Sequence, residues 1–110
     1  MAYDERLAER IRQAVAGEPG LSEKAMFGGL AFLVHGHLAV SASGQGGLLL
    51  RIDPADAPDL TSRPHVRPFE MRGRAMDGWL HVQPEAVDDD ADLQQWVDVG
   101  LAFARSLPPK

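Results

Sequence analysis

Apolar residues recur at helical spacing near both ends of the chain. Near the N-terminus the spacing predicts a helix over residues 4–16, with Asp4 as its cap and Gly17 and Pro19 ending it. Near the C-terminus it predicts a helix over residues 91–106. The predicted buried stripes are Leu7, Ile11, Ala14 and Val15 in the first helix and Leu93, Trp96, Val97, Leu101 and Ala104 in the second.

The second helix has a wider apolar arc than one buried face needs. Val99 and Phe103 extend the arc beside Trp96. Contiguous apolar surface that stays exposed usually marks an interface. Val99 and Phe103 are therefore candidate interface residues.

Between the two helices, runs of apolar and β-branched residues predict five strands. Residues 24–34, 37–43 and 47–52 form a meander, and residues 66–72 and 76–82 form a second pair joined around Gly73. Asp53 and Pro54 predict the start of a short helix between the two groups of strands. The order of elements predicts a two-layer α+β domain over residues 1–110, with a mainly antiparallel sheet and both long helices on one face.

A two-residue turn at His35 and Gly36 predicts which residues share a face of the sheet. The register places Val34 opposite His37, and one face then carries Leu33, Leu38, Ala31 and Val40. The other face carries Leu30, Phe32, Val34 and Ala39, with His37 and Ser41 among them. A sheet with one solvated face alternates between apolar and polar residues, and this sheet does not. We therefore expect both faces to be covered, one of them by a partner or a second copy.

The composition is that of a folded globular protein. The chain has 110 residues, 45% of them apolar, and no cysteine. This excludes a disulfide scaffold, thiolate catalysis and cysteine-based metal sites. The N-terminus lacks the apolar core of a signal peptide, and the longest apolar run, residues 30–34, is too short to span a bilayer. We expect a cytoplasmic protein that does not enter membranes.

Charge is unevenly distributed along the chain, whose net charge is −5. Residues 63–74 carry Arg63, Arg67, Arg72 and Arg74 against one acid, whereas the region after residue 83 is acidic. The negative net charge argues against broad, non-specific adhesion to DNA or anionic membranes. The arginine segment is the best candidate for contact with phosphate or an acidic protein, and solvated surface is its ordinary alternative.

Residues capable of catalysis or metal binding form no recognised constellation. His35 and His37 could chelate a divalent ion, but a hairpin turn directs them apart and no third ligand lies nearby in the sequence. The serines occur in no nucleophile-elbow pattern, and the glycine-rich stretches lack the lysine and spacing of a phosphate-binding loop. We expect no enzymatic activity, no metal and no cofactor.

Several segments together resemble a known family. The block from Met26 to Val34, with the sequence Met-Phe-Gly-Gly-Leu-Ala-Phe-Leu-Val, resembles the opening of the N-terminal domain of TfoX (Sxy), a bacterial competence regulator. Similar features follow at Arg51, at Arg67-Pro68-Phe69, at Gly78-Trp79 and in the closing helix through Trp96. The resemblance implies a fold like that of secretion chaperones, which commonly dimerise, and adds Arg51 to the candidate binding residues.

The resemblance also implies a role in regulating transcription for DNA uptake through protein contacts, with neither cofactor nor reaction. Full-length members carry a second, helical domain after this one, and we expect a stand-alone domain here. The leading hypothesis is therefore a regulatory or adaptor module that binds another protein, possible partners including the transcription machinery. The alternatives are a nucleic-acid or small-molecule binding module that uses residues 63–74, and an enzyme or metal protein built on the histidines. We also expect a two-fold homodimer, with an interface drawn from Phe32, Val34, Val99 and Phe103.

Overall fold

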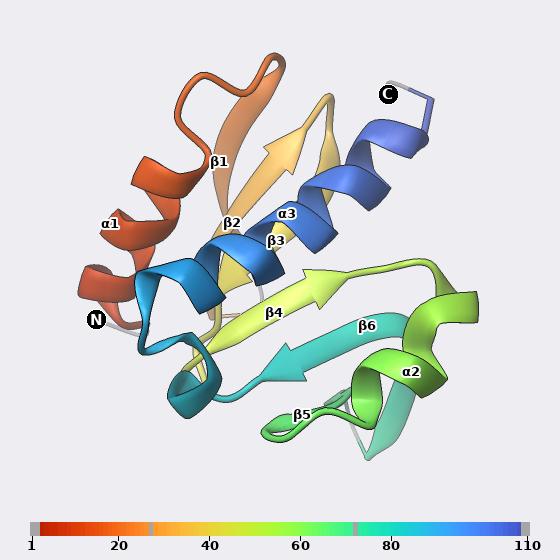
Figure 1. The fold of residues 1–110 in the computed structure, drawn as a ribbon. Coiled ribbons are helices and arrows are strands. Elements are labelled where there is room, and N and C mark those ends of the chain that lie inside the picture. Colours follow the sequence, from red (N-terminus) through yellow and green to blue (C-terminus); the bar gives the residue numbers. More distant parts are fainter. Residues whose placement is uncertain (1–2, 27, 72, 109–110) are drawn as a thin grey trace.

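The fold is an antiparallel sheet with helices on one face (Figure 1). The computed structural model describes residues 3–26, 28–71 and 73–108. In chain order the elements are α1 (Glu5–Ala14), β1 (Leu21–Met26), β2 (Gly29–Val34), β3 (His37–Ala42), β4 (Leu48–Arg51), η1 (Pro54–Asp56), α2 (Ala57–Thr61), β5 (Val66–Met71), β6 (Arg74–Val82), η2 (Pro84–Val87) and α3 (Asp90–Ser106). In this part of the chain the sheet has six strands in the order β1-β2-β3-β4-β6-β5. The α+β prediction is confirmed.

Both long helices begin at aspartate caps. The Asp4 carboxylate accepts hydrogen bonds from the backbone N–H groups of Arg6 (2.9 Å) and Leu7 (3.2 Å), and Asp89 accepts one from Ala91 (2.7 Å). These bonds satisfy N–H groups that have no partner within the first turn of a helix. The predicted start of α1 is therefore confirmed, although α1 ends at Ala14, two residues before the predicted end.

The main core lies between the helices and the sheet. Figure 1 shows α1 and α3 packed on the same side of the sheet, with α2 over the β5–β6 end. The core contains the predicted helix stripes except Ala14, which is half-buried at its edge, and its members include Leu7, Ile11, Val15, Leu93, Trp96, Val97, Leu101 and Ala104. The prediction that the first and last helices bury a common stripe is confirmed.

The predicted strand over residues 24–34 is two strands. The chain reverses between β1 and β2, where Met26 pairs with Gly29 and Gly28 has a φ of 75°. Glycine adopts this backbone conformation without the steric cost that a side chain brings. The continuous apolar run concealed the turn, so the sheet has one strand more than predicted.

The register of the β2–β3 hairpin is partly as predicted. Val34 pairs with His37 and Leu33 with Leu38, but the register then shifts between Phe32 and Leu33. Beyond the shift Ala31 pairs with Ser41, where the prediction had Val40. An inserted residue in one strand moves every later side chain of that strand to the other face. Val40 therefore lies in the main core.

The sheet face opposite the helices carries a second, smaller cluster. It consists of Ala31, Leu33 and Leu38, with Met26 and Trp79 packed against it. The three central residues are at most 9% exposed in the isolated chain. This face is therefore apolar as expected, but side chains of the same chain cover its centre, and burial there does not require a partner.

α3 crosses the sheet in close contact with it. A Cβ atom on Gly100 would lie 2.3 Å from the carbonyl oxygen of Ala39 in β3. Only glycine permits this approach, because a methyl group would overlap the strand backbone.

Among the described residues no helix has the length and apolar character needed to cross a membrane.

Candidate functional site

The two flanks of α3 have different surroundings. Residues three, four or seven positions apart lie on the same side of a helix. Gln94, Asp98 and Arg105 form one flank, which faces α1 and the loop after it; Trp96, Val99 and Phe103 form the other. We call these the paired flank and the stacked flank.

The paired flank is held by hydrogen bonds and an ion pair. Gln94 Nε2 donates to the carbonyl oxygen of Ala14 (3.5 Å) and to Asp98 Oδ1 (2.9 Å). Arg105 Nε donates to Glu18 Oε2 at 2.9 Å, and its Nη2 donates to Glu18 Oε1. The hydrogen bond from Arg105 lowers the pKa of Glu18 below its ordinary value because it stabilises the carboxylate form. This flank fixes the position of α3 relative to α1.

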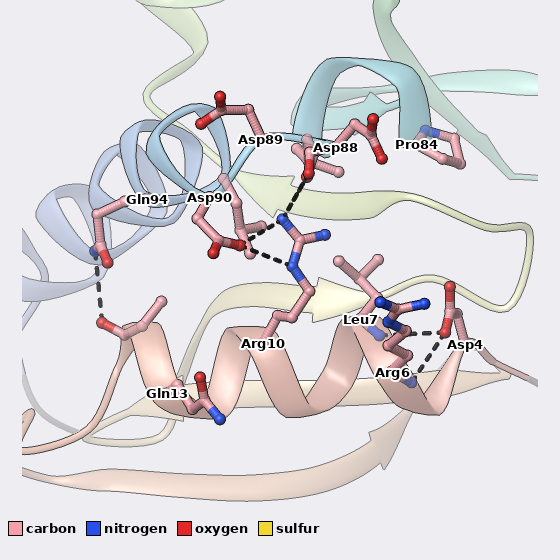
Figure 2. Close-up of a pocket in the computed structure, with 13 residues that line it drawn as sticks. Asp4, Arg6, Leu7, Arg10, Gln13, Pro84, Asp88, Asp89, Asp90 and Gln94 are labelled. Atoms are coloured by element: carbon pink, nitrogen blue, oxygen red, sulfur yellow. Dashed lines mark hydrogen bonds and ion pairs between the residues drawn. The ribbon is translucent and has the colours of Figure 1, made fainter.

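A groove of about 940 Å³ opens between α1 and the start of α3 (Figure 2). Arg10 reaches across it from α1. Its Nε and Nη2 donate to Asp90 Oδ1 at 3.0 and 2.8 Å, and Nη2 also donates to the carbonyl oxygens of Val87 (2.9 Å) and Asp88 (3.1 Å). The Arg10 guanidinium is thus used to hold η2 and the start of α3 against α1, and we assign the groove a structural role.

On the stacked flank, two arginines from other elements lie over aromatic rings. The Arg63 guanidinium carbon, just after α2, is 5.4 Å from the ring centroid of Trp96. That of Arg51, at the end of β4, is 5.7 Å from the ring centroid of Phe103 on α3 and 5.9 Å from that of Trp79 in β6, whose ring packs on the sheet face opposite the helices. A guanidinium within about 6 Å of a ring centroid is attracted by the negative face of the ring. The rings therefore attract both cations.

Neither stacked guanidinium has an acidic partner in the part of the chain that the structure describes. Among the described residues, Arg51 and Arg63 form no side-chain hydrogen bond or ion pair, whereas Arg10, Arg12 and Arg105 each pair with a carboxylate. A guanidinium held only by stacking keeps its five N–H donors for another group. The stacked flank can therefore bind an anionic group without breaking an existing ion pair.

The stacked flank also reaches solvent with apolar atoms. Trp96 is 7% exposed and belongs to the core, while Val99, Phe103 and Arg51 are half-buried and Arg63 is exposed. Fixed positive charge and apolar surface thus lie side by side, a combination suited to binding a partner that is both anionic and apolar.

A comparison with known protein families identifies the family of this chain. A family model described as the TfoX N-terminal domain matches residues 12–104. The chain belongs to the TfoX N-terminal domain family. The match includes all the strands and the whole stacked flank, and the resemblance inferred from the sequence is confirmed. Comparisons with curated proteins and with solved structures return no match.

The five candidate binding arginines of this TfoX N-terminal domain occupy different places. Arg51 and Arg63 lie on the stacked flank. Arg67 is exposed on β5, where it lines a small pocket with His81, and Arg74 is exposed at the start of β6. Arg72 lies outside the described residues. Of the described arginines in this segment, only Arg63 contributes to the stacked flank, and Arg51 joins it from a distant part of the sequence.

The four candidate interface residues also separate. Phe32 and Val34 are 0% and 1% exposed in the main core beneath the helices. They cannot contribute to a surface while the domain is folded, so their assignment to an interface is wrong. Val99 and Phe103 remain, and they lie on the stacked flank beside Arg51. Two separate predictions, the binding residue Arg51 and the interface residues of α3, thus meet at one place.

His35 and His37, the candidate metal-binding pair, lie at the β2–β3 turn. His35 lies exposed in the β2–β3 turn with a φ of 50°, and His37 Nε2 donates to the carbonyl oxygen of Pro108 at 2.6 Å. Within residues 3–26, 28–71 and 73–108 there is no group of three side chains that could hold a metal ion. The residues that sequence reasoning missed are the stacking partners, Trp79 and Trp96. The seven-residue interval from Trp96 to Phe103 is the signal that links two of the rings.

Proposed function

We propose that this TfoX N-terminal domain is a non-enzymatic regulatory or adaptor module that acts in the cytoplasm through protein–protein contacts in transcriptional regulation. The observation that carries the proposal is the stacked flank, where Arg51 and Arg63 are fixed on aromatic rings next to half-buried Val99 and Phe103. Tryptophan and arginine are the residue types that most often dominate binding energy at protein interfaces. Family membership supports the regulatory class.

The nucleic-acid alternative has less support. It relied on residues 63–74 acting together, and Arg63, Arg67 and Arg74 lie on different elements. The net charge of −5 also opposes association with a polyanion. A protein partner is the better match for a small apolar surface with two fixed cations.

Self-association would use the same surface, so a second copy and a protein partner would compete for it. Of the predicted interface residues only Val99 and Phe103 reach solvent, so a two-fold dimer should be centred on the stacked flank. Light scattering across about a hundredfold dilution range at micromolar concentration measures the mass. We expect a dimer that Val99→Asp converts to a monomer, and a monomer mass throughout would contradict the homodimer.

Site-specific photo-crosslinking in the native cell tests the proposed function. A crosslinking amino acid at position 99 should capture a protein of the transcription machinery, whereas one at the exposed Ser22 on β1 should not. Val99 and Ser22 lie on different elements, so the pair controls for general adhesion. Recovery of nucleic acid alone from position 99, or of the same proteins from both positions, would contradict the proposal.

A further inference from the structure

We infer that the stacked flank recognises an acidic amphipathic helix of a protein partner, through two carboxylates spaced two helical turns apart. This inference rests on the proposed function and names the chemistry of the partner. The carboxylates would meet Arg51 and Arg63, and an apolar side chain between them would cover Val99.

The spacing comes from α3 itself. Trp96 and Phe103 are seven positions apart on one helix, which is two turns or about 10 Å along its axis. Each carries one guanidinium over its ring, and Val99 lies between them on the same flank. A second helix with acidic residues seven positions apart repeats this interval, because both helices have the same rise per residue.

The chemistry favours carboxylates as the groups recognised. Arg51 and Arg63 have no acidic partner among the described residues, and a planar guanidinium offers paired donors that match the two oxygens of a carboxylate. The ion pair between Arg105 and Glu18 on the paired flank uses two guanidinium nitrogens in this way. Because ring stacking already restricts the two arginines, less side-chain freedom is lost when they bind.

The surroundings disfavour a polyanion. Asp92 is exposed one turn before Trp96 on the same flank. A nucleic-acid strand carries a charge about every 3.4 Å and would bring phosphates close to this carboxylate. A helix with two carboxylates at the matched interval meets the arginines and avoids Asp92.

Tryptophan fluorescence tests the inference directly. The chain has two tryptophans, and each lies under one of the two arginines. The probes are two alanine-based helical peptides of equal composition, about 20 residues long. In the matched peptide two glutamates are seven positions apart with a leucine between them on the same face, and in the mismatched peptide the glutamates lie on opposite faces. Wild-type protein should bind the matched peptide at least about tenfold more tightly.

Variants locate the contact. Arg51→Gln and Arg63→Gln should each weaken binding of the matched peptide roughly tenfold, as loss of a charge-assisted hydrogen-bonded pair implies. Arg6→Gln removes the same charge from an exposed position on α1 and should leave binding unchanged. Arg51→Lys keeps the charge but loses the planar fork, so it should weaken binding with the fold intact. A cooperative melting transition above the temperature of the binding assay establishes that each variant is folded.

Several results would overturn the inference. These are equal binding of the two peptides, equal binding by wild type and the Arg51→Gln/Arg63→Gln double variant, or binding of a ten-nucleotide oligothymidylate in place of both peptides. If position 99 still crosslinks to a transcription protein while neither peptide binds, the inferred partner chemistry is wrong and the proposed function stands. If the matched peptide binds as expected but position 99 captures no protein in the cell, the proposed function fails instead.

Discussion

The two flanks of α3 use the same residue type in opposite ways. On the paired flank Arg105 donates to Glu18, and nearby Arg10 holds the start of the helix through Asp90. On the stacked flank Arg51 and Arg63 lie on aromatic rings and have no carboxylate among the described residues. An ion pair satisfies the charge and fixes the fold. Stacking orients the cation but leaves its charge and donors available. Whether an arginine lies beside a carboxylate or on a ring therefore indicates whether its role is structural or in binding.

The largest expected effect comes from removing the ring beneath Arg63. Trp96 is 7% exposed and packs in the main core, so Trp96→Ala should lower the free energy of unfolding by about 3–5 kcal/mol. Chemical denaturation measures the loss. Phe103 is half-buried at the other end of the same flank, so Phe103→Ala should lower the free energy of unfolding clearly less. Equal losses for the two variants would mean that Phe103 is as important to the core as Trp96.

Adding a methyl group where α3 crosses the sheet should have the next largest effect. Gly100→Ala would place a Cβ atom 2.3 Å from the carbonyl oxygen of Ala39, so α3 must move away from β3. We expect a loss of about 1–3 kcal/mol in the free energy of unfolding despite the better helix propensity of alanine. Ala102→Ser, on the exposed side of α3, is the control and should change stability by less than about 0.5 kcal/mol. A more stable Gly100→Ala protein would show that the contact is looser than described.

The sequence was sufficient for the elements and for much of the core. Helical periodicity located α1 and α3 because their apolar stripes and aspartate caps are local signals. The turn between β1 and β2 was missed because it lies within a continuous apolar run, and the misplaced Val40 followed from a register shift that no local pattern announces. Phe32 and Val34 were misassigned to an interface because the sequence did not show which face of the sheet the helices cover.

The stacked flank could be predicted only in parts. Arg51 came from the family resemblance, and Val99 and Phe103 came from the wide apolar arc of the last helix. Their meeting depends on the sheet order, in which β4 lies between β3 and β6 and brings Arg51 beside Trp79. Such contacts join residues about 28 to 52 positions apart, and sequence periodicity carries no information at that range.

On the paired flank, Glu18 should give stability a dependence on pH. Its pKa is lowered in the folded protein from an ordinary value of 4.5, so its contribution is present above that pH and is lost as the pH falls through the folded pKa. At neutral pH Glu18→Gln should cost about 1 kcal/mol or less, because Arg105 is half exposed. The difference from wild type should shrink below pH 4.5 in urea denaturation series. Arg51 has no carboxylate partner among the described residues, so the difference in free energy of unfolding between wild type and Arg51→Gln should not change as the pH falls. If that difference also shrinks below pH 4.5, the pH dependence does not distinguish the two flanks.

The smallest effect tests whether Arg63 covers Trp96. A cation–π contact at an exposed site contributes about 0.5–1 kcal/mol, so Arg63→Ala should lower the free energy of unfolding by that amount. The sharper measurement is acrylamide quenching in a Trp79→Phe background, where Trp96 is the one remaining tryptophan and can be excited selectively. Loss of the guanidinium uncovers one face of the ring, so quenching of Trp96 should increase, and Arg6→Ala should leave it unchanged. Added salt should weaken the contribution of the ion pair between Arg105 and Glu18 more than that of Arg63, because stacking on a ring also uses dispersion and burial that ions do not screen. If quenching is the same with and without Arg63, the guanidinium does not remain over the ring in solution, and the stacked flank loses one of its two fixed cations.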